Sequence, residues 1–268
     1  KKAPVYQGFF YSTFARMYRL KKSLGQHFLK DESVIMEIIN ALKQEQFSNL
    51  LEVGPGAGAL TRHLIHLQSV NFKAVELDEE KVAYLEKNYP ALKGKIMQQD
   101  FLGIEKPFAG SFAVIGNFPY NISTEILFKL LEWRDEVPFI IGMFQKEVAE
   151  RIAANPGNKI YGVTSALIQP YYKIDYLFDV PPEKFNPPPK VMSAVIKLSR
   201  KKDVLEMKSA KAYKNLVKTA FNQRRKTLRN GVKSLFSAEV LKENIFDKRA
   251  EQLSIEDFAA LSFRMHKV

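Results

Sequence analysis

The stretch LLEVGPGAG, residues 50–58, passes from a short apolar run into a turn that holds three glycines. Leu60, Leu64 and Leu67 follow at helical spacing, so the sequence predicts a strand, a glycine turn and a helix in that order. Glycine lets the main chain come close to a ligand, and the free N–H groups of a helix N-terminus attract polar or anionic groups. This arrangement indicates an α/β sheet with a ligand-binding site where its strands end.

A second apolar run, residues 72–77, carries Glu76 near its end. In nucleoside-binding sheets, a carboxylate about 20 residues past the glycine turn accepts hydrogen bonds from ribose hydroxyls. We therefore expect Gly54, Gly56 and Glu76 to hold a nucleoside-bearing cofactor. The glycine spacing differs from the dinucleotide fingerprint and Pro55 interrupts it. From these residues alone, a dinucleotide and S-adenosylmethionine both stay open.

Two more predicted strands end in polar residues. Residues 95–99 lead to Asp100, whose carboxylate either accepts from an adenine amino group of the cofactor or caps a turn. Residues 112–115 lead through Gly116 into the sequence NFPY at 117–120. Open α/β sheets bind ligands at the carboxyl ends of their strands, so both segments are expected to line the same site.

The NFPY sequence suits the binding of a flat base that carries an amino group. The Asn117 side chain and the main-chain carbonyls of Phe118 and Pro119 can accept hydrogen bonds, and Tyr120 offers a ring face for stacking. Two acceptors on one exocyclic amine would leave the nitrogen lone pair free to attack an electrophile. The alternative is a strand that ends in a proline turn with a buried Tyr.

Further elements complete the predicted sheet. Residues 138–144 predict a fifth strand, 145–154 and 161–168 predict helices, and 171–180 and 191–198 predict two closing strands. The segment FNPPPK, residues 185–190, lies between the last two strands as a stiff extended loop. Two interpretations of Phe185 stay open: it reaches the ligand side of the sheet, or it belongs to the core of a rigid connection.

Strand patterns end near residue 200. Beyond it an apolar stripe at 213–221 predicts a helix, and basic residues follow at Arg224, Arg225, Lys226 and Arg229. Because acidic partners are sparse here, we expect phosphate contact, that is, RNA binding, in place of a solvated charged face. The net charge of +12 agrees with a polyanionic partner.

Composition excludes several classes of site. The absence of Cys excludes disulfides and thiolate metal sites and suits a reducing compartment, the cytoplasm. The four His residues show no metal-ligand spacing, so no metal is expected. No apolar run approaches the length of a membrane span, so no membrane partner is expected. The basic, aromatic segment 1–20 fits a transit peptide, an added leader or an RNA-contacting arm.

Nine motifs occur in an order that resembles a known family. They are KKSLGQHFLKD, LLEVGPGAGALT, VELD, QQD, GNFPYNIST, QKEVAERI, PGNKIYG, FNPPPKVMS and AFNQRRKTLRN. From about residue 21 to the C-terminal helices, the chain is similar to the small-subunit rRNA adenine-N6,N6-dimethyltransferases, the KsgA family. Each motif is modest alone, and jointly they are very specific.

The resemblance implies an α/β fold of the class I S-adenosylmethionine-dependent methyltransferases. This fold has a Rossmann-like seven-stranded sheet with an antiparallel last strand and a small C-terminal all-helical domain. The expected divisions are an extension at 1–20, a methyltransferase domain at 21–200 and an rRNA-binding domain at 201–268. The donor would be S-adenosyl-L-methionine, leaving S-adenosyl-L-homocysteine as product. The substrate would be two adjacent adenosines in the 3′-terminal hairpin loop of small-subunit rRNA, within a pre-assembled subunit, and the enzyme a monomer.

The resemblance also implies roles for particular residues. The cofactor contacts would be His27, Leu29, Gly54, Gly56, Glu76, Asp100 and Asn117. Asn117, Pro119 and Tyr120 would be catalytic, with Phe118, Tyr120 and Phe185 near the target base and Arg224, Arg225, Lys226 and Arg229 on the RNA.

The chain departs from the family pattern in three places, one of which is the segment 1–20, which matches no part of it. Phe118 stands where Leu is commoner, which is a conservative apolar change. Met192 stands where Asp is common, which puts a polar role of that position in doubt. Two rivals stay open: a large-subunit adenine methylase of the macrolide-resistance type, which AFNQRRKTLRN argues against, and a non-catalytic assembly factor.

Overall fold

The structure, a computed structural model, describes residues 27–223 and 225–266. The segment 1–20 and Arg224, for which roles are expected above, lie outside the described residues. The described chain divides into two compact units, residues 27–146 with Leu177–Lys197 and Glu147–Tyr176 with residues 198–266. The functional boundary near residue 200 stays a prediction. No helix in the described part is both long enough and apolar enough to cross a membrane.

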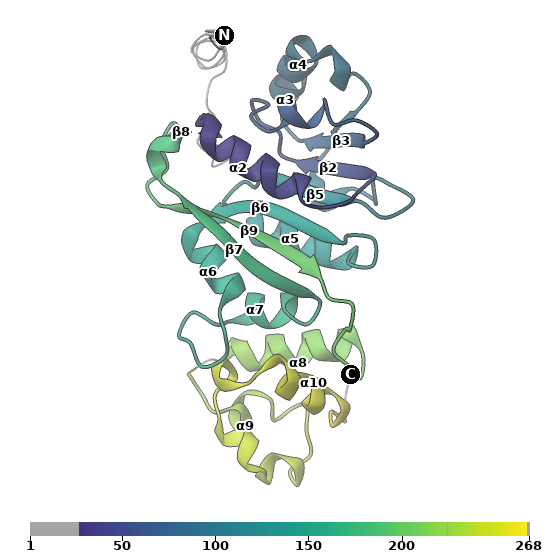
Figure 1. The fold of residues 1–268 in the computed structure, drawn as a ribbon. Coiled ribbons are helices and arrows are strands. Elements are labelled where there is room, and N and C mark those ends of the chain that lie inside the picture. The colour runs from purple at the N-terminus through teal and green to yellow at the C-terminus, as the bar shows by residue number, and fades with distance from the viewer. Residues whose placement is uncertain (1–26, 224, 267–268) are drawn as a thin grey trace. The chain divides into compact units, whose positions relative to one another are not determined.

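A seven-stranded sheet has the strand order β4-β3-β2-β5-β6-β9-β7 (Figure 1). Its strands are β2 (Asn49–Val53), β3 (Asn71–Glu76), β4 (Ile96–Gln98), β5 (Ala113–Asn117), β6 (Phe139–Gln145), β7 (Tyr172–Val180) and β9 (Ser193–Arg200). The first five pair in parallel, so their carboxyl ends lie along one edge. This edge carries the glycine turn, Glu76 and Asn117.

The last strand confirms the predicted class of sheet. β9 lies between β6 and β7, although it follows β7 in the chain. Figure 1 shows the chain running up through β7 and back down through β9, so these neighbours are antiparallel.

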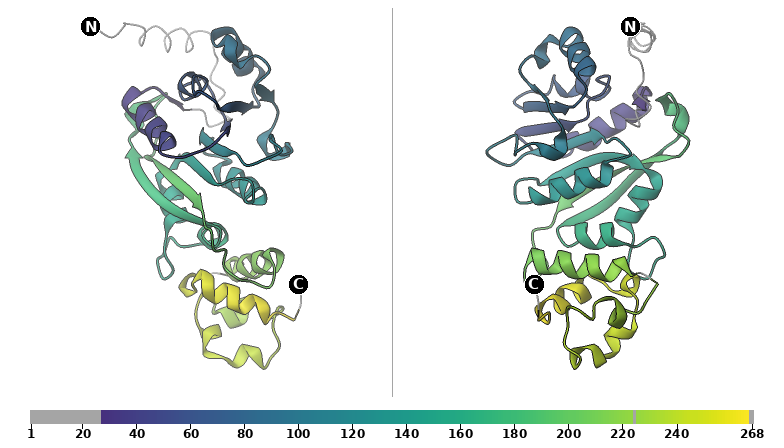
Figure 2. Two further views of the ribbon diagram at one scale, coloured as in Figure 1. Left: turned by 45° about the vertical axis from the view of Figure 1, so that its right-hand side comes forward. Right: turned by 180° about the vertical axis from the view of Figure 1, so that it is seen from behind.

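Helices cover both faces of the sheet in the first unit. α2 (Glu32–Lys43) lies in front of the strands in Figure 1, and α5 (Ser123–Glu132) lies in front in the view from behind in Figure 2. α3 (Thr61–Leu64) and α4 (Glu79–Asn88) follow the ends of β2 and β3. Asp31 caps α2 by accepting from Val34 N, and the helix buries Val34, Ile35, Ile38, Ile39 and Leu42.

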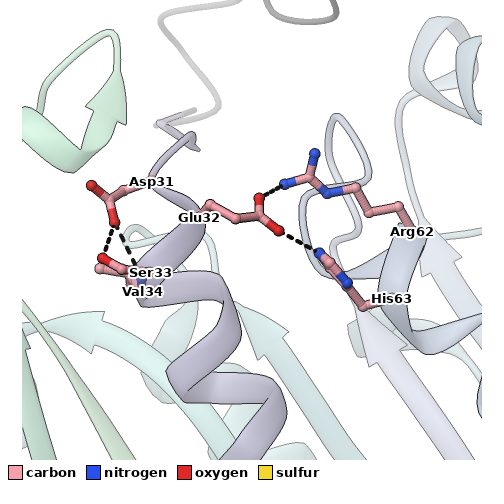
Figure 3. Close-up of polar contacts among 6 residues, drawn as sticks. All are labelled: Asp31, Glu32, Ser33, Val34, Arg62 and His63. Atoms are coloured by element: carbon pink, nitrogen blue, oxygen red, sulfur yellow. Dashed lines mark hydrogen bonds and ion pairs between the residues drawn. The ribbon is translucent and has the colours of Figure 1, made fainter. Parts of the chain in front are cut away.

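Glu32 ties the start of α2 to the helix that follows the glycine turn. Its two carboxylate oxygens contact Arg62, and His63 at 3.0 Å, both on α3 (Figure 3). Burial is the main cause that lowers the pKa of His63, and the neighbouring Glu32 opposes it. Because α3 begins just past the glycines, this bridge holds the turn against α2.

A small two-stranded sheet joins distant parts of the first unit. β1 (Phe28–Leu29) pairs antiparallel with β8 (Phe185–Asn186), so Leu29 lies opposite Phe185. Lys184 Nζ forms a 2.5 Å ion pair with Asp31, and this contact holds the pKa of Asp31 down at about 2. The sequence predicted an extended loop at 185–190, because a two-residue strand shows no periodicity.

Two glycines make room for the Phe118 side chain, which is 1% exposed. A Cβ on Gly142 would lie 2.5 Å from Phe118 Cε2, and one on Gly116 would lie 2.7 Å from Phe118 Cε1. Gly116 and Gly142 are partners in the register of β5 and β6. The ring therefore fills the space that two missing side chains leave.

We expect Gly142→Ala to lower the free energy of unfolding by about 1–3 kcal/mol, because the added methyl overpacks the Phe118 ring. Urea unfolding of the purified protein measures this change. Adding Phe118→Leu should recover part of the loss, since the smaller side chain vacates the contact. Equal stability of Gly142→Ala and the unmodified protein would contradict the packing.

The second unit contains helices that confirm the predicted C-terminal helical part. They are α8 (Ala210–Asn222), α9 (Leu228–Gly231) and α10 (Ile255–Phe263). The same unit also contains most of α6 (Lys146–Ala153) and α7 (Val163–Ile168), which agree with the helices predicted at 145–154 and 161–168. α8 buries the expected apolar stripe, and the Tyr213 hydroxyl donates to the Ala166 carbonyl at 2.8 Å. Lys211, Lys214 and Lys218 lie on the exposed side of α8.

Candidate donor and adenine site

A pocket opens at the carboxyl ends of β2, β3 and β5 in the first unit. It is lined by residues 27–29, 52–57, 59–60, 75–78, 99–101 and 117–122, with Lys81 and Ile126. Every residue predicted to hold the cofactor or to act in catalysis lies in this lining. The structure thus brings together segments that are far apart in the sequence, while the role of each residue stays a prediction.

The glycine turn has a main chain that only glycine adopts easily. Gly54 and Gly56 have φ of +70° and +59°. Gly54 N donates to the Val75 carbonyl at 3.0 Å, which joins the turn to the end of β3. A Cβ on Gly54 would lie 3.6 Å from Pro119 Cδ. The turn and the NFPY sequence therefore adjoin each other directly.

Glu76 is buried at the end of β3, where each of its carboxylate oxygens accepts one main-chain hydrogen bond. One carboxylate oxygen accepts from Gly56 N at 3.2 Å, and the other accepts from Asp78 N at 3.1 Å. Lys81 Nζ lies 3.6 Å from the second oxygen, and both charged side chains are less than a tenth exposed. Lys81 also lies 5.7 Å from the centre of the Phe28 ring. These contacts fix the carboxylate beside the glycine turn.

The Asn117 side chain is oriented by one hydrogen bond. Its Nδ2 donates to the His27 carbonyl at 3.1 Å, and its Oδ1 has no hydrogen bond within the described residues. The Pro119 carbonyl accepts from Ile122 N at 3.2 Å, whereas the described chain offers the Phe118 carbonyl no donor. Within the described residues, the Phe118 carbonyl thus keeps its full capacity to accept, whereas the Pro119 carbonyl already accepts one main-chain bond.

Two rings stack beside Asn117. The His27 and Tyr120 ring centres are 5.6 Å apart, and their planes differ by 29°. The Tyr120 hydroxyl lies 2.5 Å from Ser193 Oγ. Burial raises the pKa of Tyr120, so its side chain stays a neutral phenol at physiological pH.

Asp100 shows one of the two features that the sequence left as alternatives, the turn cap, and its contact with the adenine amino group stays a prediction. Its carboxylate caps a 3₁₀ turn by accepting from Leu102 N at 3.0 Å, and its exposed side chain also lines the pocket. One carboxylate oxygen is therefore used locally, while the side chain remains within reach of a ligand.

Burial or local contacts restrict the roles that three of the residues predicted near the substrate can have. Phe118 has a core side chain, so only its main chain can face a ligand in this conformation. Phe185 is 0% exposed within the first unit's core, which favours the core interpretation of this residue. Arg229 pairs with Asp247 at 2.9 Å and donates to the Leu241 carbonyl. Arg225 and Lys226 are exposed.

Sequence reasoning missed four residues of the site. Leu77 is 58% exposed in the pocket lining, and Lys81, Glu52 and Ser193 are buried. The sequence did contain an indication of Glu52, because it is a charged residue inside the apolar run LLEV. Lys81 carried none, since DEEK at 78–81 is typical of a solvated helix start.

Glu52 is a buried acid whose Oε2 lacks a hydrogen-bond partner among the residues that the structure describes. Burial, with the nearby Glu76 carboxylate, raises its pKa to about 8. The folded protein therefore holds a proton that the unfolded chain releases above its ordinary pKa near 4.5. By linkage, the stability that this proton contributes is present at low pH and is lost as pH rises toward 8.

We expect Glu52→Gln to flatten the pH dependence of unfolding between about pH 5 and pH 8. In the unmodified protein this carboxyl contributes a slope of roughly 1.4 kcal/mol per pH unit, with stability falling as pH rises. Melting temperatures at several pH values measure the difference. Parallel pH profiles for the two proteins would mean that Glu52 titrates normally.

Comparison with known proteins decides the family. A family model described as "Ribosomal RNA adenine dimethylase" matches residues 17–267. The chain belongs to this family. The predicted enzyme class, an S-adenosylmethionine-dependent methyltransferase that acts on ribosomal RNA adenine, is thereby confirmed.

Relatives of this dimethylase span almost its whole length. The "Ribosomal RNA small subunit methyltransferase A" of Flavobacterium johnsoniae is 50% identical, covering 91% of this chain and 95% of the relative. The protein of the same name from Parabacteroides distasonis is 49% identical, covering 94% of this chain and 96% of the relative. These matches favour the small-subunit alternative over the large-subunit one.

Solved structures show the same fold. A dimethyladenosine transferase from Plasmodium falciparum superposes with a TM-score of 0.73 at 27% identity, covering 88% of this chain and 95% of that one. The 23S rRNA methyltransferase ErmE gives a TM-score of 0.68 at 22% identity, covering 90% and 100%. The likeness to ErmE therefore supports the fold and no particular substrate.

Proposed function

We propose that the dimethylase transfers methyl groups from S-adenosyl-L-methionine to N6 of two adjacent adenosines in the 3′-terminal hairpin loop of small-subunit rRNA. It would act in the cytoplasm during ribosome biogenesis, as a monomer on a pre-assembled subunit. The names of its bacterial relatives support the small subunit as the source of the substrate rRNA. The observation that carries the chemistry is the position of the unbonded Asn117 Oδ1 in the pocket that holds the glycine turn and Glu76.

The pocket has the parts that a methyl donor of this kind requires. The glycine turn, without side chains at 54 and 56, would let the donor lie against the main chain. Glu76 would accept from the ribose hydroxyls, and Asp100 from the adenine amino group. His27, Leu29 and the exposed Leu77 would close the remaining sides. When bound, the donor supplies an electrophilic methyl group on a positively charged sulfur.

Asn117 and the Phe118 carbonyl would hold the target amine. Both accept from N6 of the adenine, which keeps the nitrogen lone pair pointed at the methyl carbon. As the N–C bond forms, the C–S bond breaks and its electron pair stays on sulfur. The amine becomes cationic, the two oxygens stabilise that charge, and the extra proton leaves to water. Repetition of this step on the same nitrogen gives the dimethylated base.

Tyr120 would stack on the adenine once the base has left its own stack. Removing a base from its neighbours costs a few kcal/mol, and an aromatic ring offsets about 1–3 kcal/mol of that cost. The catalytic contribution of the pocket would therefore be mainly positioning, with charge stabilisation added.

Transfer of tritium from labelled S-adenosyl-L-methionine to isolated ribosomal subunits tests the proposal. Undermethylated small subunits should accept label, and mass mapping should place two methyl groups on each of two neighbouring adenosines. Label on large subunits alone would favour the macrolide-resistance type of methylase. Absence of label on either subunit would favour a non-catalytic assembly factor.

We expect the charge reversals Arg225→Glu and Lys226→Glu together to weaken binding to small subunits and to flatten its salt dependence. Each lost phosphate contact reduces the slope of log K against log salt by roughly 0.7–0.9. Filter binding at several salt concentrations measures both quantities.

A matched control lies in the same unit. The Lys173 side chain is 70% exposed and forms an ion pair with Asp175. The Lys173→Glu variant reverses a single charge at a position outside the 225–226 segment. We expect its salt slope to stay at the original value. An unaltered slope in the Arg225→Glu, Lys226→Glu protein would assign that segment to solvent or to another partner.

A further inference from the structure

The connection between β7 and β9, together with the first residue of β9, holds two stacked rings of the pocket, those of His27 and Tyr120. His27 Nδ1 lies 2.9 Å from the Pro187 carbonyl, and the Tyr120 hydroxyl lies 2.5 Å from Oγ of Ser193, the first residue of β9. Because a carbonyl only accepts, Nδ1 of His27 carries a proton in this contact. One segment of chain thus fixes the His27–Tyr120 stack at two points.

Ser193 is itself firmly placed. Its side chain is 0% exposed, and the main-chain carbonyl of Met192 before it accepts from Lys146 N at 2.9 Å, just past β6. A buried hydroxyl has no water to bond with instead, so it fixes the phenol oxygen strongly. The contact of Met192 with Lys146 runs through its main chain, so it is made without the Met192 side chain.

The His27 ring covers one face of the Tyr120 ring, and Tyr120 lines the pocket. Stacked ring centres lie about 4.5–7 Å apart, so the 5.6 Å between His27 and Tyr120 is direct contact with no room for a base between them. A target base can therefore stack only on the opposite face of Tyr120. The tilt of the ring decides where that base lies relative to Asn117, three residues earlier in the chain.

We propose that Ser193 is a positioning residue for methyl transfer, which holds the Tyr120 hydroxyl so that the open ring face receives the target adenine beside Asn117. Ser193 acts through Tyr120 and touches neither the donor nor the base. The inference rests on the proposed function of the pocket. It gives the segment that follows the loop at residues 185–190 a role in positioning the substrate.

A double-mutant cycle with Ser193→Ala and Tyr120→Phe tests the inference. The measurements are kcat and KM with undermethylated small subunits, and the donor Kd by calorimetry. Each single variant should lower kcat/KM about tenfold, the effect of one lost hydrogen bond. The donor Kd should stay unchanged. The double variant should be no worse than either single one, because both remove the same contact.

Other outcomes overturn the inference. Additive losses, about a hundredfold in the double variant, would show that the two hydroxyls act separately. Tyr120→Phe keeps the ring and its packing, so unchanged kcat/KM in this variant would overturn the proposal even if Ser193→Ala folded poorly. Ser262→Ala, at an equally buried serine of α10, is the control and should keep full activity. If the unmodified protein methylated no subunit, the proposed function itself would fail.

Discussion

The Asn117→Ala variant should lose methyl transfer almost entirely, with kcat lower by about a hundredfold to a thousandfold. This is the usual loss when one preorganised group that stabilises transition-state charge is removed. The substitution deletes Oδ1, the unbonded acceptor in the pocket, together with the Nδ2 contact to the His27 carbonyl. Single-turnover assays with labelled donor measure the chemical step directly.

Donor binding separates a catalytic role of Asn117 from a cofactor role. We expect the donor Kd of Asn117→Ala to rise by less than about tenfold, because one hydrogen bond contributes only ~0.5–1.5 kcal/mol. Asn49→Ala is a matched control, since that side chain bonds to the Ser111 carbonyl at the opposite end of β2. Equal losses in Kd and kcat would make Asn117 a donor-binding residue alone.

The Glu76→Gln variant should have a donor Kd that is higher by about a hundredfold or more. Hydrogen bonds to a charged group contribute about 1.5–3 kcal/mol each, and a ribose can make two of them. The amide also cannot accept from both Gly56 N and Asp78 N as the carboxylate does. Titration calorimetry with S-adenosyl-L-homocysteine, the expected product, measures the loss without turnover.

The same substitution should lower the free energy of unfolding by about 3–5 kcal/mol, because it leaves the buried Lys81 ammonium without its partner carboxylate. Adding Lys81→Met should restore much of the stability and none of the donor affinity. If the double variant recovered both stability and donor affinity, the loss of donor binding in Glu76→Gln would be a consequence of impaired folding. Wild-type affinity in Glu76→Gln would remove Glu76 from the donor site.

Much of the site was predictable because it lies in strands of a parallel sheet. Each apolar run ended in a polar or glycine residue, and parallel pairing brings all those ends to one edge. Glu76, Asp100 and Asn117 could therefore be assigned to one pocket from sequence. The element bounds also agree closely, as with β7 at Tyr172–Val180 against a predicted strand at 171–180.

The remaining features depend on contacts that produce no periodic pattern in the sequence. The Tyr120–Ser193 contact spans 73 positions, and neither residue type predicts the other. Lys81 belongs to a charged helix start whose composition indicates solvent, yet it is buried against Glu76. The choice between the Phe118 and Pro119 carbonyls depends on the turn to Ile122, which only the folded chain reveals.

The pairing of β1 with β8 has a consequence for the order in which the chain becomes active during its own synthesis. His27, Phe28 and Leu29 leave the ribosome early, but their partner strand, the Phe185–Asn186 pair, follows more than half a chain later. A nascent chain that stops short of this point has no second strand to pin those early residues over the pocket. Residues 28 and 29, which line the pocket, therefore gain their partner strand only after translation has passed residues 185–190.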